Sequence, residues 1–401
     1  MLHKETIEII KSTVPVLEIH GTEITSVFYT RLFDNHPELL NIFNHANQRQ
    51  GRQQTALANA VYAAAAHIDR LEEIVPVVKQ IGEKHRALGI LPEHYPIVGT
   101  TLLAAMKEVL GDAATPEILN AWADAYQVIA DAFISVEAEM YEKAARVPGG
   151  WSGFRRFVIN RKVKESPLIT SLYLVPEDGG EIASYEPGQY ITLRVKPEGD
   201  SYSHLRHYSL STAPGKPYYR ITVKREDGVN GEGAGVVSTW LHRQAEEGTV
   251  VEVSAPAGSF TLNSDSELPL VLISGGVGLT PLVSMLETAL TKQPSRPVVY
   301  IHAAKCGSQH AMRDHIEQLT VQHPQLRSYV IYESPEQEDQ CHKTGYIDLE
   351  LLQETTDPGS DFYFCGPVPF MRAVYSHLKA MGVPADRAHY EFFGPAGTIE
   401  Q

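Results

Sequence analysis

The sequence predicts three consecutive domains of different fold class: an all-helical domain, an antiparallel β-barrel, and an α/β domain with a parallel sheet. Apolar residues recur every three or four positions through the first 145 or so residues, without strand alternation. From about 151 to 262, short alternating segments are separated by Pro and Gly turns. After 266, buried strands alternate with helical segments. We place the three domains at 1–147, 151–262 and 266–401, a division that suits a chain of 401 residues.

Composition narrows the class of protein. The net charge of −15 argues against nucleic acid and anionic membrane as partners. The three cysteines are scattered, which is typical of a reducing compartment. The N-terminus lacks the pattern of a signal peptide, and the longest low-polarity run, 56–66, is too short to cross a bilayer. We expect a cytoplasmic monomer that needs neither nucleic acid nor a membrane.

The helical region divides at sparse breakers into about six or seven predicted helices. The first two helices carry the apolar positions Ile7, Ile10 and Val14, and Ile24 and Val27. This division places Tyr29 on the second helix. Helices of unequal length fit more than one all-helical fold, a bundle among them.

One histidine in this region has the setting of a metal ligand. His85 lies near the predicted end of a helix that Gly89 terminates, and Pro92 stands where the next helix begins. A histidine held in this way can present one ring nitrogen to a metal while the other donates to a partner. Tyr95 and Glu137 are the candidate partners. The chain has 17 histidines, so the hypothesis depends on the residues around this one.

Taken in order, these residues resemble the globin family. Upstream of His85 come Tyr29, then Phe43, then Gln53 and Leu57, which are four apart and share a helix face. The resemblance implies that His85 binds the iron of haem b and that Phe43 packs on the haem. It implies a distal pocket lined by Tyr29, Gln53 and Leu57. Each of these side chains could alternatively be plain core.

The same resemblance gives the partners of the histidine a role. Contacts among His85, Tyr95 and Glu137 would make the imidazole more electron-rich, which favours oxygen activation over storage.

The predicted barrel carries a flavin motif. Arg206-His207-Tyr208-Ser209 resembles the Arg-x-Tyr-Ser motif of the ferredoxin–NADP reductase family. The resemblance implies that FAD is bound through Arg206 on the pyrophosphate, Tyr208 over the isoalloxazine and Ser209 towards its reactive edge. Tyr190 matches the neighbouring flavin contact. An isolated arginine is more often simply solvated.

A second phosphate-binding loop resembles the same family. It comprises Gly235, Val236, Val237 and Ser238, before a predicted helix whose first amides would receive phosphate oxygens.

The α/β domain opens with a glycine-rich turn, which comprises Gly275, Gly276, Val277, Gly278, Leu279 and Thr280. Pro281 replaces the third glycine of the usual dinucleotide fingerprint, and no acidic residue ends the next strand. The turn instead resembles the Gly-Gly-x-Gly-x-Thr-Pro nicotinamide motif of the reductases. Their Cys-Gly-Pro turn is matched by Cys365, Gly366 and Pro367, although Cys365 could also be a small buried hydrophobe.

The C-terminal segment also resembles the reductases. It comprises Glu391, Phe392, Phe393, Gly394 and Pro395. The resemblance implies that Phe392 or Phe393 lies against the flavin. A hydrophobic final strand is the alternative.

The three-motif combination resembles the flavohaemoglobin family over essentially the full length. This implies a nitric oxide dioxygenase: a hydride passes from NADH or NADPH to FAD, and single electrons pass to haem iron. Oxygen binds the ferrous haem, and nitric oxide reacts with it to give nitrate. Lys84 and Glu391 match positions near the domain contact, where they would tune the redox potentials or form an exposed ion pair.

Several alternatives stay open at this point. The sequence does not choose between NADH and NADPH, or among nitric oxide, oxygen and peroxides as the physiological substrate. A haem-based oxygen or nitric oxide sensor is one rival function, although a sensor would carry an output domain where the reductase stands. A flavin reductase with a non-catalytic globin is the other.

Overall fold

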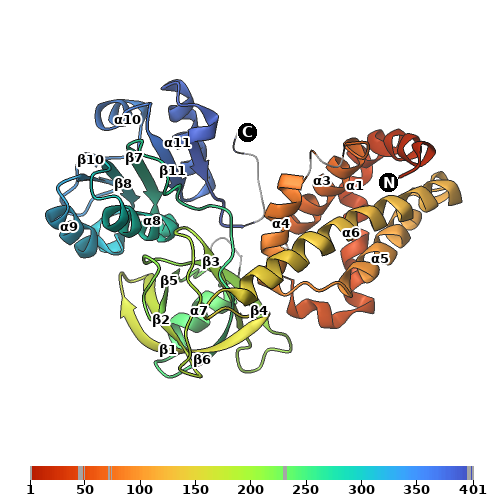
Figure 1. Cartoon of the computed structure of the whole chain (residues 1–401), viewed down its shortest axis with the longest axis horizontal. Helices are drawn as coiled ribbons and strands as arrows, with labels where there is room; N and C mark the ends of the chain where they lie inside the picture. The colour runs from red at the N-terminus through yellow and green to blue at the C-terminus, as the bar shows by residue number, and fades with distance from the viewer. Residues whose placement is uncertain are drawn as a thin grey trace. The chain divides into compact units, whose positions relative to one another are not determined.

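The computed structural model describes residues 2–43, 48, 50–70, 73, 75–228, 233–394 and 399 (Figure 1). Two compact units emerge from the internal contacts. One comprises Met1–Phe154 with Arg194–Arg206, and the other comprises Arg155–Leu193 with His207–Gln401. Among the described residues, none of the helices combines the length and the apolar character that a bilayer crossing would require.

The N-terminal part is helical. Its elements are α1 (Lys4–Asn35), η1 (Pro37–Asn41), α3 (Arg52–Ala66), α4 (Val75–Leu88), α5 (His94–Leu110), η3 (Gly111–Ala113) and α6 (Pro116–Arg146). Local signals explain the ends that matter for the site. Gly89, with φ of 78°, follows the last residue of α4. Thr115 caps α6 by accepting a hydrogen bond from the Ile118 amide, and Pro116 takes the first helical position.

The prediction that Tyr29 lies on a second helix is wrong. Helix α1 continues without a break from Lys4 to Asn35, so Tyr29 lies on the first helix. Gly21 lies inside this helix and does not end it, and a Cβ on it would lie 3.4 Å from Cβ of Ala58 in α3. The glycine permits a close approach of two helices instead. Ile10, Leu17, Ile24, Phe28 and Leu32 of α1 are all buried in one core cluster with α5 and α6.

An antiparallel sheet follows. Its strands are β1 (Phe154–Lys164), β2 (Ile169–Pro176), β3 (Tyr190–Val195), β4 (His204–Ser209), β5 (Tyr219–Lys224) and β6 (Val250–Ser254), and one helix, α7 (Val236–Arg243), precedes β6. The strand order is β4-β3-β6-β1-β2-β5. The register of β1 against β2 shifts between Ile159 and Arg161, which marks a bulge in the long first strand.

The C-terminal part is built on a parallel sheet. Its strands are β7 (Leu270–Gly275), β8 (Val298–Ala304), β9 (Leu326–Tyr332), β10 (Lys343–Thr344), β11 (Asp361–Cys365) and β12 (Ala388–Tyr390). The strand order is β10-β9-β8-β7-β11-β12, and each of these neighbouring pairs is parallel. The connecting segments are η4 (Gly276–Gly278), α8 (Leu279–Lys292), η5 (Gly307–Gln309), α9 (Arg313–Gln322), α10 (Leu349–Thr355), α11 (Val368–Ala380) and η6 (Ala385–Arg387).

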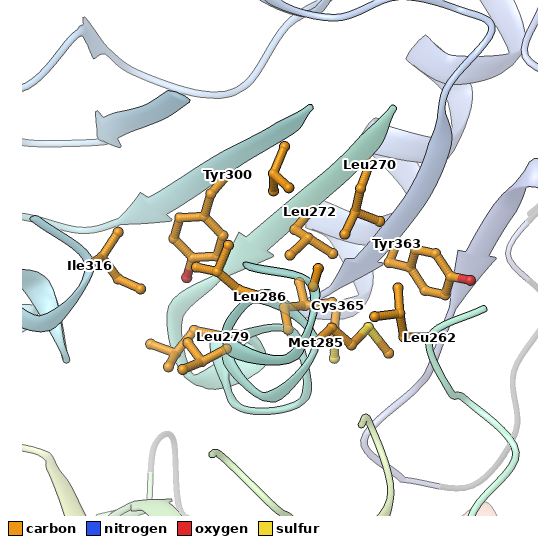
Figure 2. Close-up of a cluster of buried hydrophobic side chains, with 14 of the residues drawn as sticks. Leu262, Leu270, Leu272, Leu279, Met285, Leu286, Tyr300, Ile316, Tyr363 and Cys365 are labelled. Carbon is orange, nitrogen blue, oxygen red and sulfur yellow. The ribbon is translucent and has the colours of Figure 1, made fainter. Parts of the chain in front are cut away.

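Alternate residues of the central strands pack on opposite faces of this sheet. Leu270 and Leu272 of β7 join one core cluster, and Val271 and Ile273 join another. Figure 2 shows the first cluster, in which strand side chains point towards helix α8. Both faces are therefore covered, as expected of a parallel sheet, and the turn after β7 is held between two packed layers.

Candidate functional site

Three side chains from three helices, His85, Tyr95 and Glu137, contact one another. The Nδ1 atom of His85 (α4) lies 2.7 Å from Oε1 of Glu137 (α6) and 3.2 Å from the hydroxyl of Tyr95 (α5). Tyr95 donates to the same carboxylate oxygen over 2.7 Å. The Glu137 side chain is 4% exposed, whereas that of His85 is 32% exposed. One ring nitrogen of His85 is thus fixed on a buried carboxylate, and Nε2 makes no hydrogen bond within the described residues.

The surroundings hold this arrangement rigid. The ring of Phe133 lies 5.7 Å from that of His85 and 6.3 Å from that of Tyr95. Tyr126 donates to the carbonyl of Tyr95 over 2.7 Å. Burial raises the pKa of Tyr95, and its hydrogen bond to Glu137 raises the pKa further, so this hydroxyl stays protonated and donates.

Elsewhere among the helices, Tyr29 lies among aromatic rings and beside the amide of Gln48. Its side chain is 6% exposed, and its ring lies 5.7 Å from that of Phe43. Burial raises the pKa of Tyr29, and a hydrogen bond with the Gln48 side chain lowers the pKa by a smaller amount. Gln48 in turn donates from Nε2 to Oε1 of Gln53 over 2.9 Å. The structure therefore links the predicted residues Tyr29 and Gln53 through Gln48, and Leu57 packs partly buried against the same core.

The predicted flavin motif lies on β4. Arg206 donates to the carbonyl of Leu205 over 2.7 Å, Tyr208 is half-buried, and Ser209 is buried. His207 shares the strand face of Ser209, opposite to that of Arg206 and Tyr208, because successive side chains alternate along a strand. Its ring lies 4.7 Å from that of Tyr190, and its Nδ1 lies 2.7 Å from Oγ1 of Thr192.

The second predicted phosphate loop forms the start of α7. Gly235 stands at the N-cap of this helix and, having no side chain, gives the first amides no side-chain acceptor. The hydroxyl of Ser238 donates to the Gly235 carbonyl and accepts from the Glu226 amide, both over 3.2 Å. Val236 is exposed and Val237 is buried. This end of α7 offers backbone donors to an anion, whereas the serine hydroxyl is already in use.

The two predicted nicotinamide motifs meet at the carboxyl edge of the parallel sheet. A Cβ on Gly278 would collide with the carbonyl of Cys365, and one on Gly366 would lie 3.2 Å from Cα of Gly275. Gly276 has φ of 54° with nothing within 4 Å of its Cβ position. The turn is therefore closed on one side by the Cys-Gly-Pro turn and open at Gly276, as a backbone cradle for a phosphate requires.

Several side chains of these motifs pack in the core or make internal hydrogen bonds. The Leu279 and Cys365 side chains lie in the core cluster of Figure 2, and burial raises the pKa of the Cys365 thiol. Thr280 is buried and donates to the Val277 carbonyl over 3.1 Å. Pro367 is exposed and directly precedes α11.

In the C-terminal segment the two phenylalanines differ. Phe392 packs against the second core cluster of the sheet, 5.6 Å from Tyr390 between ring centroids. Phe393 is 50% exposed. The Glu391 carbonyl accepts from the Cys365 thiol over 3.4 Å. Pro395 lies outside the described residues. Lys84, next to His85 on α4, is half-buried.

Sequence reasoning missed three neighbours of these sites. Phe133 lies one helical turn before Glu137, so the i, i+4 spacing could have indicated it. Phe370, whose ring carbons lie 3.1 Å from the Cβ position of Gly275, follows the Cys-Gly-Pro turn by three residues. Gln48 stands in a stretch without periodicity, and nothing in the sequence pattern marks it.

Comparison with known proteins gives two family models. The model "Globin" matches residues 26–133, and the model "Oxidoreductase NAD-binding domain" matches residues 272–376. Among solved structures, the flavohemoglobin from Malassezia yamatoensis, with bound FAD and heme, has a TM-score of 0.85 at 26% identity and covers 98% of this chain and 100% of its own. The flavohem-like FAD/NAD binding domain of a nitric oxide dioxygenase from Vibrio cholerae is 41% identical, with a TM-score of 0.56, over 60% of this chain and 99% of its own.

Curated relatives match the whole chain. A flavohemoprotein of Bacillus anthracis is 57% identical over 407 aligned residues, and one of Bacillus subtilis is 50% identical over 406. Both matches cover 100% of this chain and 100% of the relative. The predicted sequence of fold classes, helical, then antiparallel, then parallel α/β, is confirmed by these matches and by the fold. The chain therefore belongs to the flavohemoprotein family, in which a globin is fused to an FAD- and NAD-binding reductase.

Proposed function

We propose that this protein is a nitric oxide dioxygenase that uses haem b, FAD and NADH or NADPH. One NAD(P)H, two nitric oxide and two oxygen molecules would give two nitrate ions, NAD(P)⁺ and a proton, which balances atoms and electrons. When bound, haem supplies an iron for oxygen and FAD divides the hydride's two electrons into single ones. The family membership supports the cofactor set, and the Malassezia relative binds FAD and heme.

The contact of His85 with Glu137 is the observation that carries the proposal. The buried carboxylate of Glu137 accepts the Nδ1 proton of His85, so Nε2 keeps its lone pair for a metal. The negative charge of Glu137 also raises the electron density of the imidazole. If His85 held the haem iron, its electron-rich imidazole would favour activation of oxygen over reversible storage. Tyr95, which donates to the same oxygen atom, keeps the carboxylate in place.

On the distal side the protein supplies hydrogen-bond donors. Tyr29 is buried with its hydroxyl protonated, and Gln53 accepts a hydrogen bond on its side-chain carbonyl from Gln48, while its own N–H groups donate to none of the described residues. Donors of this kind stabilise an oxygen molecule that accumulates negative charge. Phe43 and Leu57 would then border the haem, from their positions beside this core.

In the reductase we assign FAD to β4 and α7. Arg206, Tyr208 and Ser209 would hold its pyrophosphate and ring, with His207 and Tyr190 beside them, and the α7 amides from Gly235 to Ser238 would bind phosphate. Phe393, which is exposed, is the better candidate than Phe392 for the flavin face.

The nicotinamide dinucleotide is assigned to the cradle at Gly276, between the turn that ends β7 and the turn that ends β11. The domain limits 1–147, 151–262 and 266–401 remain our proposal, as do a redox-tuning role for Lys84 and Glu391 and a cytoplasmic monomer. The three free cysteines support a reducing compartment.

Nitrate yield during turnover tests this function. The holoprotein is supplied with NADH and oxygen, and nitric oxide is added in small portions. We expect about one nitrate per nitric oxide consumed and one NADH oxidised per two. Consumption of NADH without nitrate would instead identify a flavin reductase joined to a non-catalytic globin. Repetition with NADPH determines which dinucleotide is preferred.

A further inference from the structure

Glu287 of α8 is a buried carboxylate that joins three elements outside the sites described above. Its Oε2 accepts from the Thr212 hydroxyl over 2.8 Å and from the Ala213 amide over 2.7 Å. Its Oε1 accepts from Arg220 over 3.2 Å and lies 2.8 Å from Nε2 of His315 on α9. The Glu287 side chain is 12% exposed. We call these five residues the Glu287 clamp.

The carboxylate of the clamp is charged at every physiological pH. Burial by itself raises the pKa of Glu287, but the hydrogen bond from His315, the charge of Arg220 and the donors Ala213 and Thr212 outweigh it and lower the pKa to about 2. Tyr185 and Tyr218 are further titratable groups that interact with Glu287, and burial raises the pKa of each. A buried charge persists where donors satisfy its lone pairs, as they do here.

One end of the clamp holds the segment that follows the flavin motif. Thr212 comes three residues after Ser209, the last residue of β4. The Thr212 carbonyl accepts a hydrogen bond from Tyr185 over 2.5 Å. Arg220 of β5, besides contacting Glu287, donates to Ser211 through both its Nε and its guanidinium end. The clamp therefore holds the segment just after the flavin motif through a side chain, that of Thr212, and through the backbone amide of Ala213.

The other end is the helix that begins at the nicotinamide turn. Helix α8 starts at Leu279, directly after Gly278, and Glu287 lies eight residues further along, about 12 Å at 1.5 Å per residue. The core cluster of Figure 2 buries Leu279, Met285 and Leu286 of this helix, so α8 transmits position as a rigid body. Helix α8, whose first turn follows the nicotinamide motif, is thus joined to the segment after β4 through the Glu287 carboxylate.

We propose that Glu287 is a positioning residue for hydride transfer, setting the place of the nicotinamide turn relative to the strand that carries the flavin motif. The proposal rests on the FAD and nicotinamide assignments of the proposed function and not on the haem chemistry. Hydride donor and acceptor carbons must approach to about 3–3.5 Å, and a displacement of about 1 Å costs on the order of a hundredfold in rate. The clamp does not touch the Gly276 cradle. Loosening it changes the rate of transfer more than the affinity for the dinucleotide.

Two variants loosen the clamp to different degrees. Glu287→Gln keeps the shape but replaces one accepting oxygen with an amide that repels the donors on that side. Thr212→Val removes a single donor and leaves the Ala213 amide, Arg220 and His315 in place. Glu317→Gln is the matched control, since Glu317 makes an exposed ion pair with Arg313 on the neighbouring helix α9.

The measurement is anaerobic stopped-flow reduction of the flavin in the full-length holoprotein over a range of NADH concentrations. For Glu287→Gln we expect the limiting rate to fall about ten- to hundredfold while the apparent Kd for NADH changes less than about threefold. The long-wavelength charge-transfer absorbance of NADH against oxidised flavin should weaken in parallel. Amide exchange at Ala213 should accelerate, because its N–H loses its acceptor. Thr212→Val should show the same changes in smaller measure.

A limiting rate and a charge-transfer band equal to those of the control in both variants would overturn the proposal. A raised Kd for NADH with an unchanged limiting rate would overturn it as well, since it would make the clamp part of the binding site. If Glu287→Gln does not fold, Thr212→Val alone decides. This experiment follows flavin reduction and does not measure nitrate. If the protein proved not to be a dioxygenase, the result for Glu287 would still stand, and if the Glu287 proposal failed, the dioxygenase function would be unaffected.

Discussion

At His85 the decisive feature is that Nδ1, and not Nε2, makes the hydrogen bond to Glu137. Because Nδ1 lies on the buried Glu137 carboxylate, the imidazole can rotate little and Nε2 carries the free lone pair. The chemistry of the proposed haem site therefore depends on a carboxylate 52 residues away in the sequence. Both residues occupy helices whose ends are fixed by local signals, Gly89 after α4 and Thr115 before α6.

Glu137→Gln should weaken the proximal site. The amide keeps the shape of the side chain but removes the charge that makes His85 electron-rich, so nitrate formation should fall about ten- to hundredfold with haem retained. The iron–histidine stretching frequency in resonance Raman spectra of the ferrous protein should fall too. Glu139→Gln, on an exposed position of the same helix, is the control. Equal effects of the two substitutions would remove Glu137 from the mechanism.

Tyr29→Phe should weaken oxygen retention. A hydrogen bond to a charged partner contributes about 1.5–3 kcal/mol, so loss of the hydroxyl should raise the oxygen dissociation rate about ten- to hundredfold. The ring packing against Phe43 is preserved, and haem content should not change. Flash photolysis and stopped-flow displacement measure the rate. An unchanged dissociation rate would exclude Tyr29 from the distal role.

At the scale of elements, patterns in the sequence predicted the strands and turns better than the helix boundaries. The turn after β7 and the turn after β11 were each recognisable as motifs, and their contact through Gly278 follows from parallel strands ending at one edge. The continuous α1 was missed because its apolar positions were divided into two groups, one that ends at Val14 and one that begins at Ile24, whereas the structure shows one helix through both. Gln48 could not be found at all, since only tertiary structure brings it to Tyr29 and Gln53.

The contact between the two nicotinamide motifs predicts an unusual order of stabilities. Gly278→Ala should destabilise the protein more than Gly276→Ala, although only Gly276 has a positive φ. At Gly276 the new methyl group meets open space, and the cost is the left-handed backbone, about 1–2 kcal/mol. At Gly278 the methyl group collides with the Cys365 backbone, which cannot move aside cheaply. Chemical unfolding measures both, and the opposite order would contradict this packing.

The buried histidines beside β8 should make the parallel-sheet region acid-sensitive. His302 and His310 stack with ring centroids 4.3 Å apart, against Ser274 and Tyr332. Burial and, to a smaller extent, the charge of Arg313 lower the pKa of His310 to about 4, although Glu317 opposes them. Burial also lowers the pKa of His302 well below its usual value. The unfolded chain therefore binds protons that the folded chain excludes. Stability is full above pH 6.5 and falls towards pH 4, by about 3 kcal/mol for His310 alone.

Amide hydrogen exchange in peptides of β8, corrected for intrinsic rates, measures this loss. His310→Gln keeps a polar side chain for Tyr332 but does not titrate, so it should flatten part of the slope between pH 6.5 and 4. A slope identical to that of the unchanged protein would show that other groups govern the acid response.

In the whole molecule, the proposed function assigns flavin reduction to one set of residues and haem chemistry to another. His85→Ala should abolish nitrate formation while the flavin is still reduced by NADH at an unchanged rate, because the motifs on β4 and after β7 belong to other elements than helix α4, which carries His85. Absorbance at the flavin band measures reduction directly. Loss of both activities in a folded variant that keeps its FAD would contradict this division.

The most direct test of the central claim follows the electrons in order. Under anaerobic conditions NADH is mixed with the holoprotein, and the flavin and Soret bands are recorded together; oxygen and then nitric oxide are introduced afterwards. We expect the flavin to bleach first, the haem to become ferrous next, and nitrate to appear at about one per nitric oxide. Bleached flavin beside haem that stays ferric would contradict the account, since the reductase would then not serve the globin.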